Sequence, residues 1–360
     1  MTPDSSAETK INLYAPHIMS GDSTGRIIWT VAAAMLPALA YSSFIHGINT
    51  LLLILVCAAS AVAAEILFQL VTGRRITAAD GSAAATGLVL AMTLPPLLPL
   101  WMAAAGSCFA VIAAKQLFGG LGRNLFNPAL AGRALLFVIW SGSMRTAWNV
   151  TSEGNIPAEK LTSYGIIPQQ ALDVITSTPP GEGMYNAATV IPWFTESFTA
   201  FYDFMIGQNI LKALFAGNSG GLTGEAAVIL VLAGGVFLLW RGVITWHIPF
   251  SFLISLSFAS YFFYSFTGSV SPGFITFIHI ISGSVIPAAF FMAADPVTSP
   301  LTGRGMVIFG TGCGIFTFII RSAGFYPEAA FWAILLMNAA VPLIDKITKP
   351  PVFGLNRSSK

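Results

Sequence analysis

Charged residues are scarce in this chain, where Asp, Glu, Lys and Arg make up only 9% of 360 residues. Soluble domains carry roughly 25% charged residues, so a water-soluble surface cannot be built from this composition. The net charge of +2 is too small to indicate a nucleic-acid partner, and no basic stripe interleaved with aromatic residues occurs. The composition therefore argues against both a soluble domain and a nucleic-acid-binding protein.

Cysteine is also scarce, with Cys57, Cys108 and Cys313 each alone in an apolar run. There is no CxxC pair and no flanking histidine, so we expect neither a disulfide framework nor a metal site. We interpret the three cysteines as packing residues. The first 25 residues contain no short apolar run followed by a small-residue cleavage site, so we expect no signal peptide.

Apolar residues are abundant: 55% of the chain is hydrophobic and its mean hydropathy is +0.76. Apolar runs of about 20 residues recur, and each is long enough to cross a hydrocarbon core roughly 30 Å thick. We predict an all-α polytopic membrane protein with about ten transmembrane helices. The predicted spans lie near 27–45, 48–71, 82–95, 98–118, 126–143, 225–243, 247–267, 273–294, 305–322 and 327–345.

The basic residues of the short loops predict the orientation, because Lys and Arg are retained in the cytoplasm. With both termini inside, all of these residues fall on the cytoplasmic face: Lys10, Arg26, Arg74, Arg75, Arg123, Arg241, Arg304, Lys346 and Lys349. The predicted units are a cytoplasmic segment 1–25, a five-helix repeat 26–143, an extracytoplasmic loop 144–224, a second five-helix repeat 225–346 and a cytoplasmic tail 347–360.

Two segments in corresponding places resemble each other, SAAATGLVLAMTLPP from Ser82 and SGSVIPAAFFMAADP from Ser282. Both are rich in small residues and both are expected to break at proline. Because five spans is an odd number, two such copies in series would be inverted, with broken third helices near the bilayer midplane. Alternatively, the small residues reflect ordinary helix contacts in membranes.

Ionisable residues within the predicted spans are candidates for function. Asp80, Lys115 and Asp295 fall at predicted helix ends, where they could instead snorkel to the interface. Arg133 and His279 lie further inside, where a buried, hydrogen-bonded structural role is the alternative.

The loop GGLGRNLFNPA from Gly119 precedes the fifth predicted span. Asn127 is suited to cap that helix and Pro128 to occupy its first position. A helix N-terminus with free amides and a nearby arginine would favour an anion, but an ordinary turn and cap explains the same residues.

This loop, within AKQLFGGLGRNLFNPALAGRALLF, also carries a family resemblance. Together with YAPHIMSGDSTGRIIW, TWHIPFSFL, FFMAADPVTSPLTGRGMVIFG and IIRSAGFYPEAAFWAILLMNAAVPLID, it closely resembles the D-subunit family of Rnf complexes. The chain is similar, less closely, to the homologous B subunit of the Na+-translocating NADH:quinone reductase.

The resemblance implies a bacterial inner-membrane subunit of a ferredoxin:NAD+ oxidoreductase that couples electron transfer to Na+ or H+ translocation. The other Rnf subunits (A, B, C, E and G), a flavin transferase and membrane lipid are the implied partners. The family fold is two inverted five-helix repeats. Its members carry FMN, bonded through its phosphate to a threonine within D-x-x-(S/T)-x-A-T-P, and a second, noncovalent riboflavin. Such a chain relays electrons and needs no catalytic side chain of its own.

Two threonines are candidates for the FMN bond. Thr189 follows Ala188 as the pattern requires, but Gly183 replaces its Asp and Asn186 its hydroxyl residue. The alternative, Thr178, follows Asp173 but comes one residue too early. A third possibility is that covalent attachment has been lost.

Four further residues are predicted to contact a flavin or neighbouring helices: Arg123, Asn124, Asn127 and Arg133. Two other functions stay open. One is that of the quinone-reducing relative, and the other is a small-solute channel or facilitator, which the inverted-repeat architecture would also suit.

Overall fold

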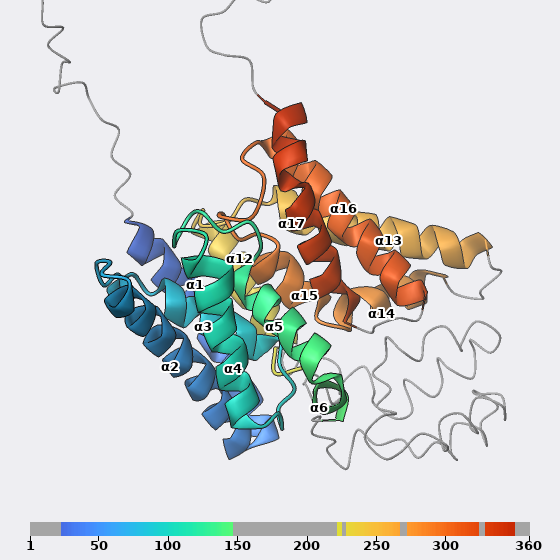
Figure 1. Cartoon of the computed structure of the whole chain (residues 1–360). Helices are drawn as coiled ribbons and strands as arrows, with labels where there is room; N and C mark the ends of the chain where they lie inside the picture. The colour runs from blue at the N-terminus through green and yellow to red at the C-terminus, as the bar shows by residue number, and fades with distance from the viewer. Residues whose placement is uncertain (1–22, 147–221, 225–227, 267–271, 324–327, 350–360) are drawn as a thin grey trace, which may run out of the picture.

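The computed structural model describes residues 23–146, 222–224, 228–266, 272–323 and 328–349. All regular structure in these residues is helical (Figure 1). Thr178, Thr189 and most of the predicted loop 144–224 lie outside the described residues.

The first half contains α1 Thr24–His46, α2 Ile48–Val71, η1 Ala78–Asp80, α3 Ser82–Met92, α4 Leu100–Val111, η2 Ile112–Gln116, α5 Pro128–Ile139 and α6 Ser141–Thr146. The second half contains α12 Val228–Trp240, α13 His247–Phe266, α14 Pro272–Ile281, α15 Val285–Pro287, η4 Ala288–Met292, α16 Gly303–Ser322 and α17 Ala329–Ile347.

Five described helices, α1, α2, α13, α16 and α17, are long and apolar enough to cross a membrane. A sixth span results if α14 and the following α15–η4 segment are taken as one bent span. Shorter apolar helices, α3, α4 with η2, α5 and α12, occupy the other predicted ranges. The all-α membrane class is thus confirmed, whereas the number of ten crossings stays a prediction.

The expected helix starts are present. The Asn127 side chain accepts hydrogen bonds from the amides of Ala129 and Leu130, and Pro128 is the first residue of α5. Proline suits that position because its missing N–H would have no helical acceptor there. In α16, the Thr302 hydroxyl caps in the same way by accepting from the Gly305 amide at 3.0 Å.

The corresponding segment of the second half ends ahead of proline as predicted, at Met292 before Pro296, but it also has a bend that the sequence did not predict. It bends by 61° between Ile275–Ile281 and Val285–Met292, and Ser284 there has a left-handed φ of 55°. Pro287 lies in the first turn of the helix that follows the bend. The N–H groups of a first turn have no acceptor within the helix, so a proline there does not interrupt the helix. In the first half α3 likewise ends at Met92, ahead of Pro95 and Pro96, as predicted.

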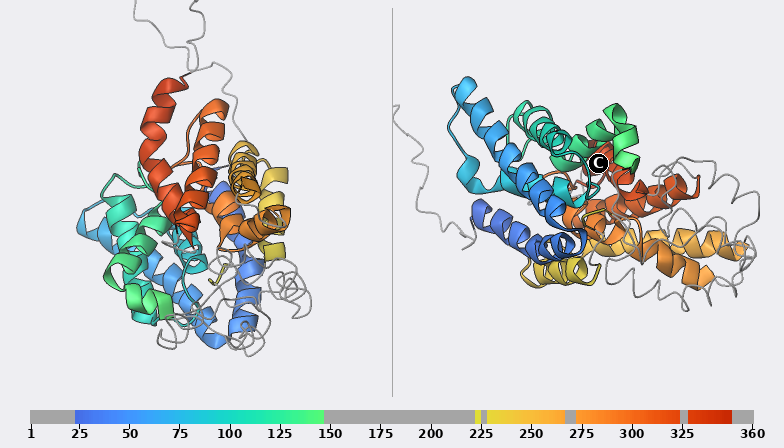
Figure 2. Two further views of the ribbon diagram at one scale, coloured as in Figure 1. Left: turned by 90° about the vertical axis from the view of Figure 1, so that its right-hand side faces the viewer. Right: turned by 90° about the horizontal axis from the view of Figure 1, so that it is seen from below.

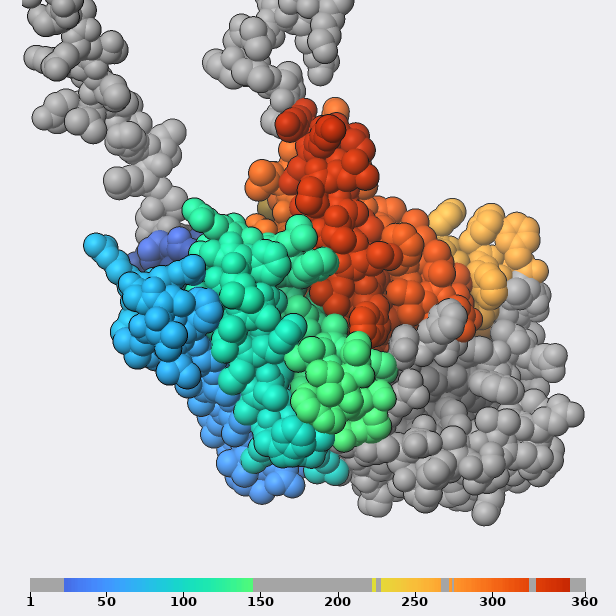
Figure 3. All heavy atoms as spheres, in the orientation of Figure 1, coloured from blue at the N-terminus to red at the C-terminus, as the bar shows by residue number. Residues whose placement is uncertain are grey.

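The two halves share a packing order. In the first, α2 packs on α3 and α4, and α4 packs on α5; in the second, α13 packs on α14 and α16, and α16 packs on α17. Helices α1 and α12 pack on each other across the halves (Figure 2). Helices α5 and α17 also contact each other across the halves (Figure 3).

The polar loops converge at one end of the molecule. Gly25 of α1 lies beside the Asp80 carbonyl, and Arg74 donates to the carbonyl of Gln116 at 3.2 Å. Gly303 lies against His247, and the Leu301 amide donates to Asp345. We call this the basic end, because it carries Arg26, Arg74, Arg75, Arg123, Arg241, Arg304, Lys346 and Lys349.

Candidate functional site

Arg133 of α5 points into the seam between the halves. It is buried, its Nε donates to the Thr93 carbonyl at 2.8 Å, and its guanidinium forms an ion pair with Glu328. The guanidinium also lies over the Phe331 ring, 4.3 Å from the ring centroid. Arg133 therefore joins α5 to the end of α3 and the start of α17, and its contact with a flavin stays a prediction.

Asn127 connects the same two halves. Besides capping α5, its Nδ2 donates to the Met292 carbonyl at 3.2 Å, in the π-helical turn η4. Asn338 of α17 is oriented so that both the nitrogen and the oxygen of its side-chain amide form hydrogen bonds. In this orientation its oxygen accepts from the Asn127 backbone N–H at 3.0 Å. Because the Asn127 side chain itself occupies the amides of Ala129 and Leu130, the ordinary cap accounts for this helix N-terminus.

Arg123 and Asn124 lie apart from that pair, in the loop before α5. Arg123 is exposed and its side chain folds over Gly119, whose φ is +112°. That backbone conformation favours glycine, and a Cβ there would also lie 2.8 Å from Arg123 Cδ. Asn124 is buried, and among the described residues its Oδ1 accepts no hydrogen bond. The structure thus divides the four predicted contact residues into two groups.

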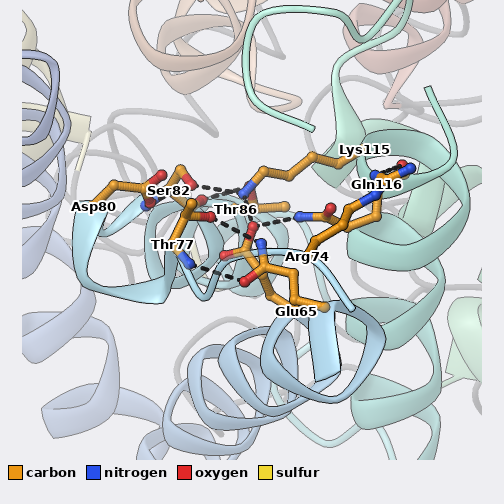
Figure 4. Close-up of polar contacts among 9 residues, drawn as sticks. Glu65, Arg74, Thr77, Asp80, Ser82, Thr86, Lys115 and Gln116 are labelled. Carbon is orange, nitrogen blue, oxygen red and sulfur yellow. Dashed lines mark hydrogen bonds and ion pairs between the residues drawn. The ribbon is translucent and has the colours of Figure 1, made fainter. Parts of the chain in front are cut away.

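A buried charged cluster lies near the basic end (Figure 4). Lys115 Nζ is 2.8 Å from Glu65 Oε1 and 2.6 Å from the Ser82 hydroxyl, and Gln116 Nε2 donates to Glu65 Oε1 at 2.6 Å. Both charged side chains are almost inaccessible, at 2% and 1% exposure. The prediction that Lys115 could snorkel to the interface is therefore wrong, because Glu65 of the neighbouring helix supplies a counter-ion inside the protein.

Sequence reasoning missed Glu65, although a signal was present. It is a single acid within the apolar run AVAAEILFQLV, and a carboxylate at such depth needs a partner. The partner could not be identified, because Lys115 is 50 residues away in the sequence. Lys115 and Gln116 both belong to the π-helical turn η2, a distortion frequent at functional sites.

The cluster continues towards the basic end. Asp80 Oδ1 accepts from the amide and hydroxyl of Ser82 at 2.7 and 2.5 Å. The Gln69 side chain pairs with Thr77, since its Nε2 donates to the Thr77 hydroxyl at 2.8 Å and its Oε1 accepts from the Thr77 amide at 2.9 Å. These bonds connect the turn after α2 to the buried ion pair. Asp80 thus orders the start of α3, which is consistent with its predicted place at a helix end.

Asp295 also has a local role. It is half-buried and accepts from the Val297 amide and the Thr298 hydroxyl, so it closes the loop after η4.

A second buried cluster lies in the other half. Arg321 of α16 donates to the His279 carbonyl at 2.8 Å and to the carbonyls of Ser282 and Gly283, which are left open where α14 breaks. Its Nη1 is also 3.1 Å from His279 Nδ1, while His279 Nε2 lies 3.3 Å from the Tyr264 hydroxyl. His279 is therefore buried and hydrogen-bonded, and sequence reasoning missed its partner Arg321.

In the part of the chain that the structure describes, the buried charged side chains connect neighbouring helices. Among the described residues, no three His, Cys, Asp or Glu side chains form a group that could hold a metal ion. The buried groups instead hold neighbouring helices together.

These features define a helical membrane protein with charged groups buried between its helices. The chain belongs to the NQR2, RnfD, RnfE family, whose sequence model matches residues 12–354.

Comparison with curated proteins gives relatives over nearly the whole chain. It is 37% identical to the D subunit of a proton-translocating ferredoxin:NAD(+) oxidoreductase complex of Clostridium ljungdahlii, covering 98% of this chain and 99% of the relative. It is also 37% identical to the D subunit of a Na(+)-translocating ferredoxin:NAD(+) oxidoreductase complex of Acetobacterium woodii, covering 96% of both chains. The D subunit of an ion-translocating oxidoreductase complex of Citrobacter koseri is likewise 37% identical, covering 94% of this chain and 97% of the relative.

Proposed function

We propose that this chain is the flavin-carrying membrane subunit of an Rnf-type ferredoxin:NAD+ oxidoreductase that couples electron transfer to Na+ or H+ translocation. The observation that carries the proposal is the full-length similarity to the D subunits of two such complexes. The chain would act within an assembly of the other Rnf subunits, A, B, C, E and G, after a flavin transferase has matured it.

The proposed architecture is ten spans in the bacterial inner membrane, arranged as two inverted five-helix repeats. The shared packing order of the halves and the contact between α1 and α12 support it. The basic end would face the cytoplasm with both termini, because Lys and Arg are retained there. The loop 144–224 would then lie outside. Reporter fusions in the 241–246 loop and in the 144–224 loop test this orientation. Reporters that fall on the same side of the membrane would refute it.

We further propose that FMN is bonded through its phosphate to Thr189 or, alternatively, to Thr178. On the proposed topology, Arg123 and Asn124 would lie at the opposite membrane face from this FMN. They precede α5, whose 12 residues span about 18 Å, and the loop that carries both threonines follows the other end of that helix. Any flavin that they contact would be a separate, noncovalent group such as riboflavin, for which the buried Oδ1 of Asn124 is a suitable acceptor.

The FMN would supply the one-electron and two-electron chemistry of the relay. The protein's own residues would hold the helices around it. Arg133 and Asn127 would fix α5 to the second half, since their polar groups contact Thr93, Glu328 and Met292. We therefore assign these two residues a positioning role.

The decisive experiment uses the complex purified from its native host. The chain should appear as a flavin-fluorescent band on a denaturing gel, with FMN on the peptide that contains Thr189. Thr189→Val should abolish the fluorescence, whereas Thr178→Val should not; the reverse would assign Thr178. A dark wild-type band would overturn the covalent attachment alone.

A second assay tests the activity itself. Membranes should reduce NAD+ with reduced ferredoxin, and deletion of the chain should stop this reaction. If the deletion instead abolished a quinone-linked activity, the result would favour the function of the B subunit of the quinone-reducing relative. Solute uptake by proteoliposomes that contain this chain alone would favour a channel.

A further inference from the structure

The chain reverses direction tightly where α2 ends at the basic end. Gly73 has a left-handed φ of 66°, and its amide donates to the Leu70 carbonyl at 3.2 Å. The Arg74 amide donates to the Gln69 carbonyl at 2.8 Å. These two bonds form a Schellman motif, the helix end that glycine favours. The motif leaves Arg74 and Arg75 directly beyond the last turn of α2, and both side chains are exposed.

Arg74 is held in place but keeps most of its hydrogen-bond donors. Its Nη1 donates to the Gln116 carbonyl at the end of η2, at 3.2 Å (Figure 4). Its guanidinium also lies over the Phe68 ring, 5.6 Å from the ring centroid. A guanidinium has five N–H donors, so the remaining ones can bind a ligand.

No carboxylate neutralises these two arginines. Within the part of the chain that the structure describes, neither Arg74 nor Arg75 forms an ion pair. The acids of α2 and η1 are already engaged, because Glu65 is buried in an ion pair and Asp80 accepts two hydrogen bonds. The end of α2 therefore favours a ligand with negative charge.

The length of α2 places the two arginines at the level of lipid headgroups. The helix has 24 residues, which extend about 36 Å, and the hydrocarbon core is about 30 Å thick. Arg74 and Arg75 follow directly after its end, where phospholipid phosphate is concentrated. Helix α2 also runs along one edge of the molecule, where lipid can reach it (Figure 1).

Exposed apolar side chains adjoin the arginines. On α2, Leu67 precedes Leu70 and Val71 by three and four residues, so the three form one flank of the helix, and all are exposed. Leu117 and Phe118, which follow the carbonyl that Arg74 contacts, are exposed as well. A soluble phosphate would use only the arginines, whereas a phospholipid would use both the arginines and the apolar flank. Phosphatidylcholine carries a cationic choline that the arginines would repel.

We propose that the end of α2 is a binding surface for an anionic phospholipid. Its phosphate would contact Arg74 and Arg75, and its acyl chains would lie along Leu67 and Leu70, with Leu117 beside them. The inference needs only the membrane location of the chain and is independent of the flavin. Basic residues next to a transmembrane helix are suited to anionic headgroups.

The test is native mass spectrometry of the intact complex with phosphatidylglycerol or phosphatidylcholine supplied as the only lipid. The wild-type complex should retain phosphatidylglycerol in preference to phosphatidylcholine. Arg75→Gln should weaken phosphatidylglycerol binding about fivefold, and the double variant with Arg74→Gln about thirtyfold, since each basic residue near the surface contributes about 1 kcal/mol. Arg75→Lys should retain most of the binding. Arg75 makes no hydrogen bond or ion pair with the described residues, so its substitution tests the ligand without disturbing the fold.

Leu117→Asn distinguishes a lipid from a free anion. It should weaken phosphatidylglycerol retention, because it removes an apolar contact that a soluble phosphate would not use. If Leu117→Asn has no effect and inorganic phosphate competes at similar affinity, the surface is a free-anion site and the proposal is wrong.

The matched control is Arg304→Gln, which removes an exposed arginine of the basic end at the start of α16, in the other half. An equal loss in this control would reduce the effect to overall charge and overturn the site. Equal retention of phosphatidylcholine by the wild-type complex would also overturn it. If the arginine variants lose another subunit while lipid retention is unchanged, the surface is a contact between subunits and the proposal is wrong.

Discussion

Lys115 and Glu65 form an ion pair of 2.8 Å between η2, which follows α4, and the last third of α2, with both side chains almost fully buried. A buried charge costs several kcal/mol unless it is paired and hydrogen-bonded. Ser82 and Gln116 supply the further hydrogen bonds. The four residues therefore hold α2, α3 and η2 at fixed spacings.

Breaking this pair should destabilise the protein. Glu65→Gln leaves the Lys115 ammonium buried without its counter-ion, so we expect a loss of roughly 3–5 kcal/mol. Thermal unfolding in detergent, followed by tryptophan fluorescence, measures the effect. The double variant Glu65→Gln with Lys115→Met should be more stable than Glu65→Gln alone. Lys346→Met, at an exposed position, is the control; a similar loss there, or no coupling in the double variant, would contradict the buried pair.

Arg133→Lys should also be strongly destabilising, although it keeps the charge. A lysine cannot donate to the Thr93 carbonyl, pair with Glu328 and lie flat over Phe331 together. We expect a lower unfolding temperature and weaker protection of α17 from hydrogen exchange. Arg123→Lys, at an exposed position, should change neither quantity. Equal behaviour of the two variants would show that the seam does not depend on Arg133.

The two roles of Asn127 can be separated by substitution. Asn127→Ala removes the cap of α5, worth about 1 kcal/mol, and the bond to Met292, worth about another 1 kcal/mol. Asn127→Asp keeps an oxygen for the cap and loses only the donor, and its new charge would face the Met292 carbonyl. Unfolding midpoints should therefore fall for both variants, while hydrogen exchange of the α5 amides should rise only for Asn127→Ala. Faster exchange in both would contradict the division of roles.

Gly87 is required where α3 crosses α2. A Cβ there would lie 2.5 Å from the Cys57 carbonyl oxygen, so Gly87→Ala must push two backbones apart. Overpacking of this kind costs about 1–3 kcal/mol. Gly142→Ala is the matched control, since a Cβ at Gly142 meets nothing within 4 Å. Unfolding midpoints should differ between these variants, and equal midpoints would refute the close approach.

Local patterns in the sequence were enough to determine the class of protein and the helix ranges. Apolar runs bounded by charge, glycine and proline predict where helices lie, because a helix must satisfy its own backbone inside a bilayer. The cap at Asn127 and the proline at the start of α5 follow from local chemistry and were confirmed. The placement of short-loop basic residues also anticipated that they share one end of the molecule.

Only the tertiary structure decided what the polar residues contact. Glu65 with Lys115 and Arg133 with Glu328 are pairs of distant residues, and no local pattern identifies a partner 50 or more positions away. The bend at Ser284, which does not coincide with a proline, likewise depends on a distant residue, because Arg321 donates to the carbonyls that the bend exposes. The sequence determined where the helices lie because helix formation in a membrane is a local requirement. Burial of charge between helices is decided by packing, which brings together residues from different parts of the chain.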